Sequence, residues 1–239
     1  FVDTQQECEL TIYKVDDKNE EVKLSGAESG DLRWFNKSYT RQLLKDENVR
    51  KRLYAVDVHS YCLPIPIPVS IPFLNNRSGF VKRFRNWMDR KYPDVPIKMS
   101  EWTHMQGGRD YGMDSAIVTA TVMYEDFTLL NVTSWQHWIA VSEVDYCDGL
   151  IYINIPEKTF EITKRYYVTG NYTKYVERGA KRIEACTDDN DLLLTAFEKD
   201  GKVTLVAVNK IQSEKTIDLP TDGNILVSVT DKDNNLKEV

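Results

Sequence analysis

Carboxylate and aromatic side chains gather at the predicted ends of four short apolar segments of this sequence. Glu101 is the sharpest candidate, because it directly follows the segment Ile97 to Ser100, which predicts a buried strand. A carboxylate among indole and phenol rings suits sugar hydrolysis: the carboxylate attacks or stabilises an oxocarbenium-like centre, and the rings stack on the C–H faces of pyranoses. The residues at the four ends are Glu28, Asp31, Asp57, His59, Tyr61, Glu101, Trp102, Trp135, Gln136, His137 and Trp138.

Each of these residues also has a plainer interpretation. Glu101 could be a surface glutamate, and His59 a structural histidine with its hydrogen bonds satisfied. Trp135 and Trp138 could be ordinary core residues, Trp138 more so than Trp135. The functional interpretation therefore depends on whether the fold brings these side chains to one place.

Two spacings could instead offer metal ligands, namely His59-x-x-Cys62 and Glu101-x-x-His104. Glu-x-x-His works as a ligand pair mainly on a helix, where residues i and i+3 share a face, whereas this one follows a predicted strand. We therefore predict no metal site. The sequence also has no glycine-rich phosphate loop and no Gly-x-Ser-x-Gly elbow, so we predict no cofactor, no phosphoryl transfer and no serine hydrolase.

The elements that must position these residues alternate between strand and helix. Four apolar segments that end in polar residues predict buried strands, and a helix candidate follows each of them. Four such units of roughly 30 to 40 residues are typical of a parallel α/β domain, whose active site lies at the C-terminal ends of the strands. The predicted strands are Val22 to Gly26, Tyr54 to Val58, Ile97 to Ser100 and Thr128 to Trp135. The predicted helices are Thr40 to Leu53, one with the apolar stripe Phe80, Val81, Phe84, Trp87 and Met88, then Met113 to Tyr124, and Thr163 to Val176.

From about Arg182 the pattern changes to an alternation of period two, which predicts a small antiparallel β module. The dipeptide Asp200-Gly201 between two apolar segments is a strong hairpin signal. The predicted strands are Leu192 to Phe197, Val203 to Val208, Lys215 to Leu219 and Asn224 to Thr230.

Composition narrows the class of protein. With 239 residues and 41% hydrophobic content the chain can build a buried core. The formal charge of −6 argues against nucleic acid and anionic membranes as partners and favours a neutral glycan. No apolar run is long enough to span a bilayer, and four widely spaced cysteines without a Cys-x-x-Cys pair suggest mostly buried thiols.

The sequence resembles glycoside hydrolase family 30, a clan A group of retaining enzymes with an eight-stranded barrel and an attached β-sandwich. The resemblance implies the C-terminal half, strands five to eight, of a (β/α)8 TIM barrel over residues 1–180. It also implies an incomplete β-sandwich module over residues 181–239, and Glu101 as the catalytic nucleophile. The segments that carry it are Asp57-Val58-His59-Ser60-Tyr61, Met99-Ser100-Glu101-Trp102, Asn131 to Trp138, and Lys164-Arg165-Tyr166-Tyr167.

A finer resemblance points to the branch that contains endo-β-1,6-galactanases. It depends on Tyr111 to Ala116, Ser134-Trp135-Gln136 and Asp148-Gly149-Leu150. Glucuronoxylanases and β-1,6-glucanases share the scaffold, so the fold does not fix the substrate. The expected location is extracellular or secreted, at the cell surface or in a periplasm.

The sequence also departs from the family pattern. Its four predicted strands match the fifth to eighth of the barrel, so the first four are missing, together with the Asn-Glu-Pro segment that supplies the acid/base glutamate. Gln6-Glu7-Cys8 resembles the loop after the fourth strand, but too few residues follow it for a barrel helix. Half a barrel would expose strand edges and an apolar interior, so we expect another polypeptide segment to complete it.

In a completed barrel Glu101 would attack the anomeric carbon, with the acid/base carboxyl about 5 to 5.5 Å away. The resemblance places His59, Tyr61, Glu28 and Gln136 at the sugar hydroxyls and Trp135 beneath the reacting ring, with Trp102 and Trp138 as further contacts. Three alternatives stay open: a carbohydrate-binding homologue without turnover, a metal-dependent hydrolase, and a purely structural piece of a larger assembly.

Overall fold

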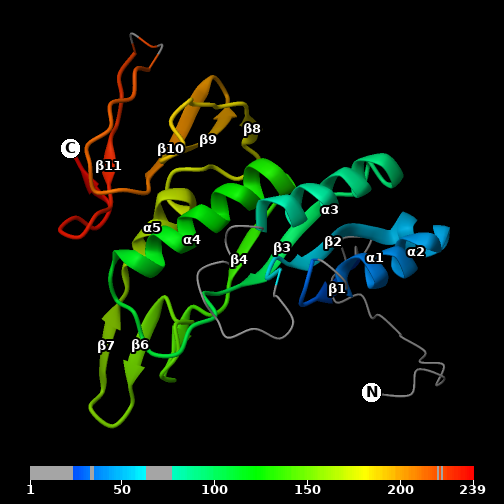
Figure 1. The fold of residues 1–239 in the computed structure, drawn as a ribbon, viewed down its shortest axis with the longest axis horizontal. Coiled ribbons are helices and arrows are strands. Elements are labelled where there is room, and N and C mark those ends of the chain that lie inside the picture. Colours follow the sequence, from blue (N-terminus) through cyan, green and yellow to red (C-terminus); the bar gives the residue numbers. More distant parts are fainter. Residues whose placement is uncertain (1–23, 33–34, 63–76, 220, 222) are drawn as a thin grey trace, which may run out of the picture.

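A computed structural model describes residues 24–32, 35–62, 77–219, 221 and 223–239. Its centre is a parallel sheet of four strands whose spatial order is their order in the chain, which confirms the predicted parallel α/β arrangement (Figure 1). The strands are β1 (Leu24–Ser29), β2 (Leu53–His59), β3 (Ile97–Trp102) and β4 (Trp135–His137). The first two residues of the predicted strand Val22 to Gly26 and the segment Gln6-Glu7-Cys8 lie outside the described residues.

Helices connect these strands, and one more helix, α5, follows the last of them. They are α1 (Phe35–Lys45), α2 (Glu47–Arg52), α3 (Arg77–Lys91), α4 (Met113–Glu125), the π-helical η2 (Asp126–Leu130) and α5 (Lys164–Thr173). The predicted helix Thr40 to Leu53 is in fact two helices, because the Asp46 side chain accepts the backbone N–H groups of Asn48 and Val49 and so starts a new helix at that point.

The prediction of strand from Thr128 to Trp135 is wrong over its first residues. Thr128 lies in η2, and Trp135 is where β4 begins. The β-branched and leucine residues of this stretch fit a buried helix end as well as a strand, since a short apolar run does not distinguish the two.

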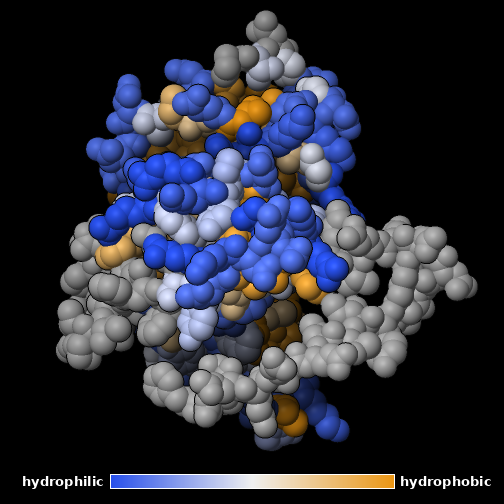
Figure 2. Space-filling view, turned by 90° about the vertical axis from the view of Figure 1, so that its right-hand side faces the viewer, coloured by the Kyte–Doolittle hydropathy of each residue, from blue (hydrophilic) through white to orange (hydrophobic). Residues whose placement is uncertain are grey.

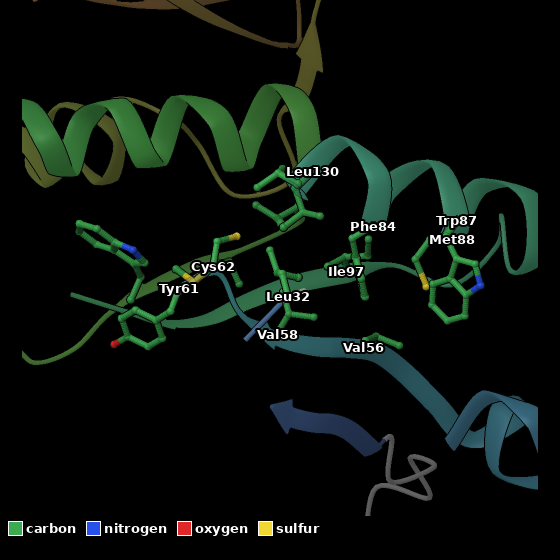
Figure 3. Close-up of a cluster of buried hydrophobic side chains, with 14 of the residues drawn as sticks. Leu32, Val56, Val58, Tyr61, Cys62, Phe84, Trp87, Met88, Ile97 and Leu130 are labelled. Carbon is green, nitrogen blue, oxygen red and sulfur yellow. The ribbon is translucent and has the colours of Figure 1, made fainter. Parts of the chain in front are cut away.

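The main core lies between α3 and one face of the sheet. Phe84, Trp87 and Met88 of α3 point toward Val56 and Ile97 of the strands (Figure 3). This confirms the apolar stripe predicted from the sequence. Burial of each such side chain contributes about 1.5–3 kcal/mol, so this helix fixes one side of the strands that carry the site. The helix ends at Lys91, just before Tyr92-Pro93, where a proline disfavours helical backbone in the residue before it.

The opposite face of β1, β2 and β3 is polar. The Ser25 hydroxyl donates to the Asp57 carboxylate, and the Lys98 ammonium lies 3.3 Å from the other oxygen of Asp57. Asp57 is 3% exposed, so this ion pair is largely removed from water. The expectation of an apolar interior is therefore wrong for these strands.

A second small sheet follows β4 and was not predicted. It contains β5 (Val141–Ser142), β6 (Ile151–Asn154) and β7 (Thr159–Ile162), with the β6–β7 hairpin at the lower left of Figure 1. Phe160 of the hairpin is 65% exposed. Strands of two to four residues are too short to leave a clear periodic signal.

The C-terminal region forms two antiparallel sheets. One contains β8 (Lys181–Ile183), β9 (Leu192–Lys199) and β10 (Lys202–Asn209), and the other β11 (Ser228–Val229) and β12 (Lys237–Glu238). The predicted hairpin is confirmed: Asp200 and Gly201 both have positive φ, the backbone that tight hairpin turns require. The strand predicted at Lys215 to Leu219 is not found in the described residues, and Asn224 to Thr230 keeps only β11. A β-sandwich is not confirmed.

The sheet of β8, β9 and β10 packs on the helices that follow β3 and β4. Phe197 and Val206 contact Met123 of α4 and Tyr172 of α5 in a second core cluster. On the side of the molecule at the right of Figure 1, the surface is mainly hydrophilic with small hydrophobic areas between (Figure 2). This fits α2, in which no residue is buried. The division into domains at residue 180 stays a prediction.

Candidate active site

Glu101 lies near the C-terminal end of β3, with 26% of its side chain exposed. One carboxylate oxygen, Oε1, accepts a hydrogen bond from the Tyr61 hydroxyl at 3.2 Å and lies 3.5 Å from Nδ1 of His59. His59 pairs with Glu101 across the sheet because an irregularity at Val58/His59 shifts the register of β2 against β3. The structure therefore brings Glu101 to two residues, His59 and Tyr61, that lie about 40 positions before it in the sequence.

Burial, followed by the negative charge of Glu101, raises the pKa of Tyr61 well above its usual range. The phenol therefore keeps its proton and acts as a donor to the Glu101 carboxylate. A fixed donor on Oε1 leaves the second oxygen, Oε2, as the one that can face an incoming group.

Glu28 extends the cluster from β1. Its Oε2 lies 2.9 Å from Nε2 of His59 and accepts a hydrogen bond from the Ser100 hydroxyl at 2.5 Å. Burial alone would raise the pKa of Glu28, but the contacts with Ser100 and His59 outweigh it and lower that pKa. A protonated His59 can donate to both carboxylates, whereas a neutral imidazole can donate to one. Sequence reasoning missed Ser100, whose position beside Glu101 gave no sign of a contact with β1.

Trp135 begins β4 beside this cluster. Its indole Nε1 donates to Oδ2 of the Asp126 carboxylate at 2.9 Å, so the ring is held by a hydrogen bond as well as by packing. Its ring centroid lies 6.2 Å from that of Trp102. Asp126 was also missed, because the sequence predicted an ordinary helix end there.

The remaining predicted residues divide by exposure. Trp138 is 50% exposed and Gln136 is exposed, so both could contact a ligand. Trp102 is only 2% exposed and belongs to the main core cluster, so we do not place it on the substrate surface. Close polar contacts between side chains join Glu28, His59, Tyr61 and Glu101.

The segments after β3 and β4 are tied to each other. Gly107 and Tyr146 form an isolated β-bridge, and the backbone N–H of Cys147 donates to the Gln106 carbonyl at 2.9 Å. Arg165 of α5 reinforces the junction: its guanidinium donates to the carbonyls of Asp110 and Gly149. Together these segments form one surface next to the C-terminal ends of the strands.

Within the described ranges, no three His, Cys, Asp or Glu side chains come close enough to share a metal ion. The thiols of Cys62 and Cys147 are buried, as predicted for most of the cysteines, and that of Cys186 is exposed; Cys8 lies outside the described residues. In the described part of the chain, no helix has the length and apolar character needed to cross a membrane.

A cavity of about 200 Å³ lies between Tyr124 and residues 185–194. None of its lining residues belongs to the predicted site. It is lined by the end of α4 and by β9 and the segment before it, so it does not bear on the chemistry of Glu101.

Comparison with known proteins adds an independent line of evidence. The sequence model of O-glycosyl hydrolase family 30 matches residues 35–152. Among solved structures, a family 30 endoxylanase from Clostridium papyrosolvens C71 is 17% identical, with a TM-score of 0.60 over 91% of this chain and 50% of its own. A family 30 subfamily 8 xylanase from Clostridium acetobutylicum is 19% identical, with a TM-score of 0.60 over 91% of this chain and 49% of its own.

An endo-β-1,6-glucanase is 17% identical, with a TM-score of 0.55 over 83% of this chain and 41% of its own. At these identities the likeness concerns the fold. The chain spans about half the length of the two xylanases. The described parallel sheet is consistent with part of a barrel of this kind.

Proposed function

Since the chain belongs to glycoside hydrolase family 30, we propose that it carries the nucleophile half of a retaining glycoside hydrolase active site for β-linked polysaccharides. The observation that carries the proposal is the Glu101 carboxylate at the end of β3, with the Tyr61 hydroxyl and the His59 imidazole on one of its oxygens. A carboxylate held in this way is oriented for attack, because the Tyr61 hydroxyl donates to Oε1 and leaves Oε2 as the oxygen that can approach a sugar.

In the proposed reaction Oε2 of Glu101 attacks the anomeric carbon. The C–O bond to the leaving sugar breaks, that sugar takes a proton from a carboxylic acid, and a glycosyl ester forms on Glu101. The same acid, now a carboxylate, removes a proton from water, whose oxygen attacks the anomeric carbon and frees Glu101. Two displacements retain the configuration of the sugar.

We assign the proton donor to an N-terminal half-barrel segment outside these 239 residues. The support is twofold: the resemblance places the acid/base glutamate on the fourth strand of the barrel, and the matching xylanases are about twice as long as the part that this chain covers. The two carboxyl groups would lie about 5 to 5.5 Å apart. Their proximity keeps the acid protonated until the charge of Glu101 is consumed.

The proposed substrate is a neutral polysaccharide of the β-1,6-galactan kind, with glucuronoxylan and β-1,6-glucan as alternatives within the same family. Glu28 and Gln136 offer hydrogen-bonding groups for hydroxyls, and the partly buried Trp135 offers a ring for stacking. Such substrates lie outside the cell, so we propose a secreted or cell-surface protein.

The test uses the full-length protein and its Glu101→Gln variant, with reducing-sugar release measured on the three polysaccharides. We expect release from one of them, and a loss on the order of 1,000-fold or more in Glu101→Gln, because the amide cannot serve as the nucleophile. Glu157→Gln is the matched control, since Glu157 is exposed in the β6–β7 turn, and it should retain full activity.

A 2-deoxy-2-fluoro glycoside of the cleaved sugar should label the peptide that contains Glu101, as detected by mass spectrometry. If the full-length protein binds one of the polysaccharides but releases no reducing sugar from it, the protein is instead a carbohydrate-binding homologue. Loss of activity on addition of a chelator would favour a metal-dependent hydrolase and contradict the proposal.

A further inference from the structure

Asp126 lies where the chain turns from helix to strand behind the site. It is the first residue of η2, is 0% exposed, and directly follows α4. Its carbonyl oxygen accepts the backbone N–H groups of Asn131 and Val132, and Asn131 ends the helix in the left-handed conformation with φ of 56°. The backbone of Asp126 is therefore fixed at the point from which β4 starts.

The carboxylate of Asp126 has three different donors. Oδ1 accepts from Nη2 of Arg77 at 2.6 Å, and Oδ2 accepts from the Ser60 hydroxyl and from the Trp135 indole, each at 2.9 Å. Nη2 of Arg77 also donates to the Ser60 oxygen at 2.8 Å, which closes a ring of three polar side chains. Every carboxylate oxygen is satisfied, so a single position of this side chain is favoured.

Charge balance keeps this buried group in place. Burial disfavours the charge on Arg77, but Asp126 and Glu125 outweigh it and raise the pKa of the guanidinium. Burial also disfavours the charge on Asp126 and so raises its pKa. The charge of Arg77 and the hydrogen bonds from Arg77, Trp135 and Ser60 oppose that rise. Glu125 pairs with the other terminal nitrogen of Arg77: its Oε2 lies 2.6 Å from Nη1. It makes no hydrogen bond to Ser60 or Trp135 in the described residues.

The two neutral donors of Asp126 both belong to segments of the candidate site. Ser60 stands between His59 and Tyr61, the two residues that contact Oε1 of Glu101. Trp135 begins the strand next to the one that carries Glu101. Among the described contacts Asp126 has none with Glu101 itself, so any effect on the reaction passes through these two neighbours.

We infer that Asp126 is a positioning residue, which holds the Trp135 ring and the His59–Ser60–Tyr61 segment in place for the reaction at Glu101. The inference rests on the proposed function for its kinetic part. Its structural part, a hydrogen bond that sets the Trp135 ring, can be measured without any substrate. No group of Asp126 reacts with the sugar.

The experiment compares Asp126→Asn with Glu125→Gln in the full-length protein. Both variants replace a carboxylate of the Arg77 pair by an amide of the same shape, but only Asp126→Asn changes the acceptor of Ser60 and Trp135. We expect Asp126→Asn to lower kcat about 100-fold with a smaller change in KM, the size of effect that a small misplacement of a reacting group produces. Glu125→Gln should keep kcat within about twofold, even where its Tm falls.

The substrate-free readout is the indole N–H resonance of Trp135, assigned with Trp135→Phe. A bond to a buried carboxylate should place it downfield and slow its exchange with water. It should move upfield in Asp126→Asn and stay in place in Glu125→Gln. If the unaltered protein cleaves no polysaccharide, the proposed function fails, and this resonance still decides whether Asp126 holds the ring.

Ser60→Ala covers the case in which Asp126→Asn does not fold, because it removes one of the two neutral donors and keeps the ion pair. We expect it to lower kcat about 10-fold, consistent with the loss of one hydrogen bond in a positioned network. An unchanged kcat in Ser60→Ala, an unmoved Trp135 resonance in Asp126→Asn, or an equal kcat loss in Glu125→Gln would each overturn the inference.

Discussion

Among the described residues, two arginines are fully buried, and their surroundings differ in kind. Arg77 of α3 pairs with the carboxylates of Asp126 and Glu125. Arg165 of α5 donates to carbonyl oxygens, to hydroxyls and to a thiol; these acceptors belong to Asp110, Ser115, Cys147, Gly149 and Tyr152. Both have 0% exposure, so neither charge is stabilised by water. One cation is balanced by anions, and the other by neutral dipoles together with the nearby charge of Asp110.

This difference fits the two tasks. Arg77 joins helix α3 to the helix end behind the sheet, where both partners are regular elements. Arg165 joins the segments after β3 and β4, where the available acceptors are exposed by the irregular backbone. Burial first, and then the charge of Arg165, lowers the pKa of both His104 and His137. The histidines near Arg165 are therefore harder to protonate than free histidines. Arg77, in contrast, lies between two carboxylates.

The largest effect is expected from Arg77→Met. It leaves Asp126 as a buried carboxylate without its cation, which costs about 3–5 kcal/mol of unfolding free energy at neutral pH. Without Arg77 the pKa of Asp126 in the folded state lies far above its unfolded value, so the fold takes up a proton as the pH falls. The penalty should thus be greatest near pH 7 and shrink toward about pH 5.

Urea denaturation at several pH values measures this penalty. Adding Asp126→Asn to Arg77→Met removes the stranded charge and should restore part of the loss. A penalty that does not change with pH would contradict the ion-pair interpretation.

Arg165→Met should cost less, about 2–3 kcal/mol, because it strands neutral acceptors rather than a charge. The loss should be the same at pH 7 and pH 8. Hydrogen exchange should also become faster in residues 138–163, since the link between the two segments is weakened. Exchange that accelerates equally across the central sheet would show instead that Arg165 supports the whole fold.

The smallest effect concerns the part of the stability loss at acidic pH that is due to His137. Burial lowers the pKa of His137 from 6.5 to about 4, and Nε2 donates to the Asp148 carbonyl at 2.8 Å. Nδ1 has no hydrogen-bond partner among the described residues, so a proton there would be unsatisfied. The unfolded chain binds that proton below pH 6.5 and the fold does not, so stability falls from pH 6.5 toward about 4.

His137→Gln keeps an N–H donor for Asp148 and does not titrate. It should remove roughly 1–2 kcal/mol of the acid destabilisation, less than the full pKa shift would give, because the His137 side chain is half-buried. Urea midpoints between pH 7 and pH 4 measure this difference. An unchanged acid profile would mean that other groups account for the loss of stability.

Regular elements with a strong apolar period were predictable from the sequence. The apolar pattern predicted the stripe of α3 and the bounds of α4. The hairpin at Asp200-Gly201 was also predictable, because a tight turn depends on the residues of the turn itself. Failures occur where tertiary contacts decide. The helical residues before Asn131 read as a strand, and β5 to β7 are too short for a period to be seen.

The site divides in the same way. Glu101, His59 and Tyr61 were predictable as a group because parallel strands bring their C-terminal ends to one edge, and Glu28 fits this rule as well. Ser100, Asp126 and Arg77 were not, since their partners lie on other elements and nothing in the local sequence marks the contact. The burial of Trp102 depends on the face of β3 after a register shift, which the alternation pattern alone does not give.

The π-helical turn of η2 has a consequence for how the chain tolerates length changes. An α-helix advances by about 100° per residue, so deleting one residue between Asp126 and Asn131 would tighten η2 into an α-helical turn and swing Asp126 away from β4 by about that angle. The geometry behind the site is thus encoded in a residue count as much as in residue identity. A sequence alignment that places a gap between Asp126 and Asn131 would not show this dependence on length.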